Sequence, residues 1–287
     1  MSGIEKQELW EPVVRSETRA DGSILVWTEE PLAAYPRCIT ERFMYWAETV
    51  PDRVWMAERG PDREMIEITY REAAEKIRSI GSALVARGLS PERPLMILSG
   101  NSIAHALMAL GAQHVGVPSA ALAPAYALTG GDFLKLRDVV GQLTPGMVFA
   151  DKAMPFAPAI EAVVDTAVPV ITVEGDVPGR ETIAFDTIAA TAPTPEMEAA
   201  HADIKPDTVA KFLFTSGTTG SPKAVIQNQR MICSNPQMDA QCYLFMKDTP
   251  PVVVDWAPWN HTASGNRVFH LVIYFGGTYY IDDGRPT

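Results

Sequence analysis

The feature that most constrains the fold is an alternation of short apolar runs with segments of helical periodicity between residues 95 and 173. Apolar runs predict buried strands at residues 95–98, 117–122, 147–150 and 168–173. Intervening segments predict helices at residues 102–115, 132–143 and 156–164. Short apolar strands that alternate with helices are typical of a parallel sheet covered by helices. The sequence therefore predicts an α/β fold.

The stretch from Pro94 to Gly131 contains no Asp, Glu, Lys or Arg, so a membrane helix has to be considered. A spanning helix needs about 20 consecutive apolar residues. This stretch is interrupted by Gly111, Gly116 and Pro118, and it contains two histidines. We therefore expect a buried strand–helix–strand unit and no membrane span.

The composition excludes some classes of partner. The formal net charge of -11 disfavours nucleic acid, because an acidic chain repels a phosphate backbone. The three cysteines lack metal-site spacing, and the first residues lack the basic and apolar regions of a signal peptide. We expect a cytoplasmic protein that binds no nucleic acid. The sequence does not indicate its oligomeric state.

Two helices are predicted before the α/β pattern begins. Apolar residues at helical spacing start at Ile39, and Pro51 ends that run. Thr69 and Glu72 have the spacing of a capping box, in which each side chain satisfies a backbone N–H of the first helical turn. Gly88 is placed to end this second helix.

Changes in pattern divide the chain into four segments. The first contains a predicted hairpin at residues 12–29, whose turn is Asp21-Gly22. Pro193, Pro195 and Pro206, among Ala, Thr and Glu, predict a loose connection at residues 191–206. The predicted segments are an N-terminal hairpin extension at 1–38, a first α/β lobe at 39–190, a linker at 191–206, and the start of a second α/β lobe at 207–287.

The sequence T-S-G-T-T-G-S-P-K follows an apolar run at residues 209–214. Glycines let backbone N–H groups turn toward an anion, and hydroxyls donate hydrogen bonds to phosphoryl oxygens. A lysine adds a charge, and hydrogen bonds to charged groups contribute about 1.5–3 kcal/mol each. We therefore predict a phosphate-binding loop made of Thr215, Ser216, Gly217, Thr218, Thr219, Gly220 and Lys223.

Two other interpretations of this loop stay open. A Walker-type ATPase needs Gly directly before the lysine and Ser or Thr directly after it. Pro222 and Ala224 occupy those positions, which disfavours that class. A purely structural turn between two strands is the other alternative. The density of hydroxyls and the closing Pro-Lys pair argue against it.

The loop resembles the signature loop of the adenylate-forming superfamily, which contains acyl- and aryl-CoA synthetases, peptide-synthetase adenylation domains and luciferases. Residues 51–53 and 68–72 resemble the opening of that family's N-terminal domain, and residues 258–265 resemble its aromatic-or-His gate segment. Ala224 departs from the pattern, because the family usually has Gly there. The resemblance implies the N-terminal large-domain portion of the adenylate-forming fold, truncated, with two lobes of mixed or parallel sheet flanked by helices.

Within this superfamily the chain is most similar to feruloyl-CoA synthases and their aryl-acid relatives. That likeness depends on residues 259–262, on Gly265-Asn266, and on residues 276–286. It implies an aromatic or hydroxycinnamic acid such as ferulate as substrate. Fatty acyl-CoA synthetases and adenylation domains are the alternatives within the superfamily.

The resemblance implies a two-step reaction with ATP, Mg²⁺ and coenzyme A. A carboxylate attacks the α-phosphate of ATP, and the CoA thiolate then displaces AMP. The loop residues hold the β- and γ-phosphates, Thr218 contacts the metal, and Lys223 and His261 have catalytic roles. The implied acid pocket is formed by Trp259, Asn260, His261 and Asn266, and Trp256 is a further candidate.

The family has further functional elements that we do not find in these 287 residues. They are a Tyr-Gly-x-Thr-Glu segment, the aspartate that holds the ribose, the hinge, and a C-terminal lysine. We therefore expect the chain to be catalytically incomplete. The alternative from a different class is a non-catalytic remnant that binds nucleotide weakly or not at all.

Overall fold

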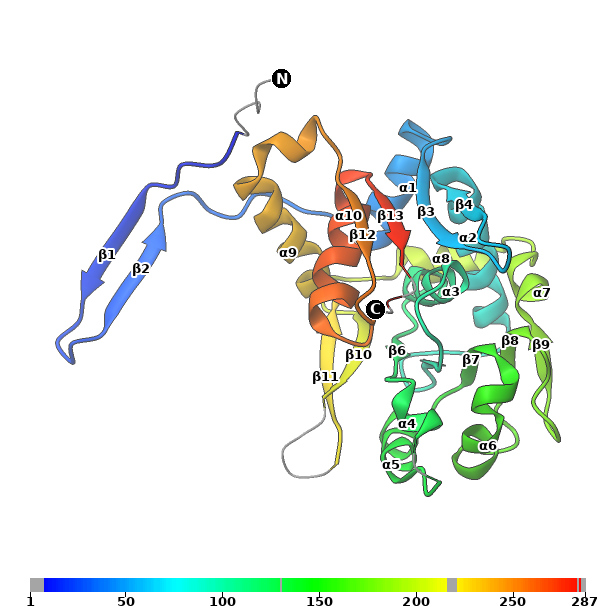
Figure 1. Cartoon of the computed structure of the whole chain (residues 1–287). Coiled ribbons are helices and arrows are strands. Elements are labelled where there is room, and N and C mark those ends of the chain that lie inside the picture. Colours follow the sequence, from blue (N-terminus) through cyan, green and yellow to red (C-terminus); the bar gives the residue numbers. More distant parts are fainter. Residues whose placement is uncertain (1–7, 130, 216–220, 283, 285–287) are drawn as a thin grey trace.

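The computed structural model describes residues 8–129, 131–215, 221–282 and 284 (Figure 1). The predicted hairpin is confirmed as strands β1 (Val14–Thr18) and β2 (Ile24–Thr28), which project away from the body of the molecule. Gly22 adopts a φ of 83°, and the Asp21 carboxylate accepts a hydrogen bond from the Ser23 amide. A tight turn of this kind requires a residue that tolerates positive φ.

The largest sheet has seven strands, and six of them are parallel. The edge strand β11 is antiparallel to its neighbour β10. The four predicted apolar runs form β5, β6, β7 and β8, which confirms the parallel α/β prediction. In spatial order the strands are β11 (Lys223–Asn228), β10 (Val209–Thr215), β6 (Ser119–Ala121), β5 (Leu95–Ile97), β7 (Met147–Lys152), β8 (Val170–Glu174) and β9 (Thr182–Ala184).

Helices cover both faces of this sheet, as alternation along the strands requires. Met96 packs with one set of helices, and its neighbours Leu95 and Ile97 pack with the other. The first set is α4 (Ala125–Leu128), α5 (Leu134–Leu143) and α6 (Ala153–Val163). The second set includes α2 (Tyr70–Ala86), α3 (Ile103–His114) and α7 (Phe185–Ala189).

A second sheet of four strands lies on the far side of α3, which contacts strands of both sheets. Its order is β12 (Val252–Asp255), β13 (Thr278–Ile281), β3 (Val54–Arg59) and β4 (Met65–Thr69). The helices beside it include α1 (Ile39–Thr49), α9 (Gln229–Cys242) and α10 (Phe269–Phe275). Each sheet takes strands from both sides of residues 191–206. The two lobes in space are therefore not the two consecutive stretches of chain that the sequence suggested.

The two predicted early helices are confirmed as α1 and α2. Thr69 caps α2 by accepting a hydrogen bond from the Glu72 amide, and the Glu72 carboxylate accepts one from the Thr69 amide. The Thr69 interactions lower the pKa of Glu72. Gly88, with a φ of 69°, follows the helix end. Among the described residues, no helix is long and apolar enough to cross a membrane.

Residues 191–206 differ from the loose connection expected there, because they contain the helix α8 (Pro195–Ala202). Thr194 caps it by accepting a hydrogen bond from the amide of Met197, whose side chain is fully buried. Arg78 of α2 forms an ion pair with Glu198. Prolines suggested a loop, but Pro at the first helical position is favourable, because that N–H has no helical partner.

Candidate functional site

The predicted phosphate loop connects β10 to β11. Thr215 is the last residue of β10, Lys223 is the first of β11, and the two residues pair directly. The Thr215 hydroxyl donates a hydrogen bond to the Lys223 carbonyl at 3.5 Å. The remaining predicted phosphate contacts, Ser216, Gly217, Thr218, Thr219 and Gly220, lie outside the described residues.

Helix α5 holds the far end of this connection in place. The Ser221 hydroxyl donates to the Asp138 carboxylate at 2.9 Å, and the Gln142 amide donates to the Pro222 carbonyl at 2.9 Å. Both partners come from α5, which belongs to the helical layer on the Met96 face of the sheet. The entry to β11 is therefore tied to the sheet's own helical layer, so the position of Lys223 depends on the packing of α5.

The gate segment at residues 258–265 forms a turn followed by a π-helical segment (Ala263–Val268). The His261 amide donates to the Pro258 carbonyl, and the His261 carbonyl accepts from the Gly265 amide at 2.8 Å. These bonds fix the backbone of His261, and its side chain is exposed. The histidine is thus presented on the surface of the turn.

Trp259 is a core residue with a polar anchor. Its ring is 4% exposed, and its indole N–H donates to the Tyr279 hydroxyl at 2.9 Å. That hydroxyl donates in turn to the Asp255 carboxylate at 2.8 Å, which also accepts from Ser264 at 2.5 Å. Burial raises the pKa of Tyr279, so its proton stays available for this bond. The network fixes the ring of Trp259 in one orientation.

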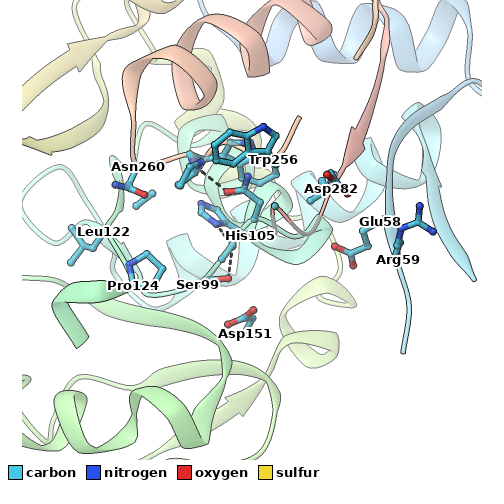
Figure 2. Close-up of a pocket in the computed structure, with 17 residues that line it drawn as sticks. Glu58, Arg59, Ser99, His105, Leu122, Pro124, Asp151, Trp256, Asn260 and Asp282 are labelled. Atoms are coloured by element: carbon cyan, nitrogen blue, oxygen red, sulfur yellow. Dashed lines mark hydrogen bonds between the residues drawn. The ribbon is translucent and has the colours of Figure 1, made fainter. Parts of the chain in front are cut away.

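One cavity of about 620 Å³ opens at the carboxyl ends of β5, β6 and β7 (Figure 2). Ligands of parallel α/β sheets typically bind at this edge. The predicted residues Trp256, Trp259 and Asn260 line it. Three carboxylates that were not among the predicted site residues also line it: Glu58, Asp151 and Asp282. Burial raises the pKa of Glu58 and of Asp151, so each carboxyl group gives up its proton at a higher pH than an exposed one does.

A second cavity, of about 500 Å³, lies between α9, β11 and the π-helical segment. Its wall includes Asn266, whose side-chain amide donates to the side-chain oxygen (Oε1) of Gln227 on β11 at 3.2 Å. Thr262, next to His261, also lines it. The structure therefore divides the predicted acid pocket, since Trp259 and Asn260 border the larger cavity and Asn266 borders this one.

Lys211 was not among the predicted site residues. This residue of β10 is buried, with 6% exposure, and its ammonium donates to the Gly265 carbonyl at 2.8 Å. Burial lowers the pKa of Lys211 to about 8. The sequence contained one signal for this residue, a single lysine inside the apolar run at 209–214. A lysine in a buried strand is rare unless it has a partner, so its presence there indicates a specific contact.

Comparison with known proteins agrees with this fold. The chain belongs to the AMP-binding enzyme family, whose model matches residues 43–287. It is 28% identical to 4-coumarate–CoA ligase 3 of Oryza sativa subsp. japonica, over 74% of this chain and 37% of that protein. It is 25% identical to long-chain-fatty-acid–CoA ligase 1 of Homo sapiens, over 80% of this chain and 34% of that protein. The chain thus spans little more than a third of these relatives.

Solved structures with the same fold have lower identity. An adenylation domain of a keto acid-selecting peptide-synthetase module, bound to keto acyl adenylate, superposes with a TM-score of 0.70 at 15% identity, covering 88% of this chain and 43% of that one. ATP-bound MatB from Rhodopseudomonas palustris superposes with a TM-score of 0.61 at 18% identity, covering 85% of this chain and 45% of that one. The fold is therefore that of the N-terminal part of adenylate-forming enzymes.

Proposed function

We propose that this protein acts in ATP-dependent acid–CoA ligation. The observation that carries the proposal is the β10–β11 hairpin, whose connection has the hydroxyl- and glycine-rich sequence and ends at Lys223. Gln227 of the same hairpin contacts Asn266 in the wall of the 500 Å³ cavity. The same hairpin thus carries the proposed phosphate-binding sequence and, through Gln227, borders a cavity large enough for a small acid.

The proposed chemistry has two steps. A carboxylate oxygen attacks the α-phosphorus of ATP, and pyrophosphate leaves. The CoA thiolate then attacks the acyl carbon, and AMP leaves. Both steps develop charge on phosphate oxygens, so a preorganised set of donors is an effective catalyst.

Residue roles follow from that chemistry as part of the proposal. Thr215, Lys223 and the loop residues 216–220 hold the β- and γ-phosphates, and the Thr218 hydroxyl would hold Mg²⁺. His261, on the exposed turn, meets the carboxylate end of the acid. Asn266 lines the 500 Å³ cavity that would hold the acid. Trp259 and Asn260 line the neighbouring 620 Å³ cavity, from which the acid would enter.

For the substrate we propose an aromatic acid of the hydroxycinnamic type, such as ferulate. The similarity to a 4-coumarate–CoA ligase supports this choice. A fatty acid is the second candidate, because a long-chain-fatty-acid–CoA ligase matches a comparable share of the chain. A panel of ferulate, coumarate, benzoate and a fatty acid separates the two.

Two assays test the proposal. Lys223→Ala, placed at the equivalent position of an intact homologous enzyme, should impair adenylation far more than it lowers stability. Unchanged adenylation would remove Lys223 from its role. ATP–pyrophosphate exchange by the folded 287-residue chain, measured with the acid panel, separates a chain that adenylates from the non-catalytic remnant, which would give no exchange. Exchange with the fatty acid alone would contradict the aromatic assignment.

A further inference from the structure

A small chamber of about 20 Å³ lies between the two cavities. It shares His270 with the 500 Å³ cavity, and it shares His105 and Trp259 with the larger one. Its volume suits a single water-sized group. The chamber is therefore far smaller than either cavity and borders both through shared residues.

The ammonium group of Lys211 lines this chamber without a counter-charge. In the part of the chain that the structure describes, no Asp or Glu lines the chamber, and the one hydrogen bond of the ammonium goes to the Gly265 carbonyl. An ammonium has three donors. A buried cation without an anionic partner is costly, so an anionic or polar group in the chamber would be strongly favoured.

Two other buried polar atoms border the same space. Among the described residues, neither His270 Nε2 nor Gln113 Oε1 has a hydrogen-bond partner, and both residues are about 98% buried or more. Burial lowers the pKa of His270 well below its ordinary value, so the ring is neutral, with one nitrogen that donates and one that accepts. Asn266 Oδ1 is also without a partner, in the wall of the adjoining cavity.

We propose that the chamber binds one ionisable oxygen, that of a phenol hydroxyl or one oxygen of a second carboxylate, at the far end of an acid held in the 500 Å³ cavity. Lys211 is then a specificity-determining residue that donates to this oxygen, with His270 beside it. The inference rests on the proposed function, because it specifies the class of acid that the cavity selects. An apolar end would leave the ammonium and the imidazole unpaired, and sites with unpaired buried polar groups reject such ligands strongly.

Matched acids test this inference by calorimetric titration of the 287-residue chain. The set is cinnamate, 4-hydroxycinnamate and 4-carboxycinnamate, which differ only at the far end. We expect at least one of the two oxygen-bearing acids to bind at least tenfold more tightly than cinnamate. In Lys211→Met this preference should fall below about twofold. Lys205→Met, an exposed lysine before β10, is the matched control and should keep the preference.

Each contrary outcome has a distinct meaning. Equal binding of all three acids by the wild type would overturn the inference and leave the proposed function standing. A preference that survives in Lys211→Met would overturn the role of Lys211. No binding of any acid would overturn both the inference and the acid cavity on which it rests. If circular dichroism shows that Lys211→Met does not fold, Lys211→Gln takes its place, and the wild-type comparison still decides.

Discussion

Lys211→Met should stabilise the protein at neutral pH, and the gain should shrink at alkaline pH. Burial lowers the pKa of Lys211 from its ordinary 10.5 to about 8. Below about pH 8 the folded and unfolded states both carry the proton, and the folded state bears the cost of a buried charge. Between about pH 8 and 10.5 only the unfolded state binds the proton, so the stability of the wild type rises with pH.

The size of the effect follows from the shift. The difference between 10.5 and about 8 is about 2.5 pKa units, and each unit corresponds to about 1.36 kcal/mol. The free energies of unfolding of the two proteins should therefore converge by about 3 kcal/mol across that window. Loss of the bond to the Gly265 carbonyl adds a constant offset, which does not depend on pH.

Urea unfolding of both proteins at half-unit steps from pH 7 to 10.5 measures this difference. Burial raises the pKa of Tyr70 and of Cys233, so both groups affect alkaline stability. They occur in both proteins, and their contributions cancel in the difference. A difference that stays constant over the whole range would refute the reasoning, since it would mean that Lys211 titrates alike in the folded and unfolded states.

Other substitutions test the packing around the site. Tyr279→Phe removes the hydroxyl between the Trp259 indole and the Asp255 carboxylate and should lower the free energy of unfolding by about 1–3 kcal/mol in urea titrations. Gly265→Ala would place a Cβ 1.9 Å from the Trp259 carbonyl oxygen, so its melting temperature should fall sharply. Gly141→Ala, which meets open space in α5, should instead gain up to about 1 kcal/mol. A Gly265→Ala variant as stable as the wild type would contradict the close approach.

Local patterns predicted much of the fold. The strands around Met96 and Val148 were recognisable because burial on both faces leaves continuous apolar runs. The capping box at Thr69 was recognisable because its two hydrogen bonds need only a fixed spacing. Features of this kind depend on neighbours in sequence, so the sequence alone carries them.

Non-local pairing was not predictable in the same way. Strand β13 pairs with β3, so Tyr279 lies beside Met56, far away in the sequence. Trp259 was expected in an acid pocket. Its ring lies in the core, where the indole N–H donates to the Tyr279 hydroxyl and the ring packs against His105. The contact between the Lys211 ammonium and the Gly265 carbonyl was not predictable for the same reason, because Gly265 comes from a distant element.

The phosphate-binding loop is the central claim, and binding of phosphates by the 287-residue chain tests it most directly. Affinities for MgATP, pyrophosphate and AMP would be measured for the wild type, Lys223→Met and the control Lys205→Met. Hydrogen bonds to charged groups contribute about 1.5–3 kcal/mol, so Lys223→Met should weaken ATP and pyrophosphate binding roughly tenfold to a hundredfold. AMP, which lacks the outer phosphates, should bind all three proteins alike. Equal ATP affinity in the wild type and Lys223→Met would contradict the account.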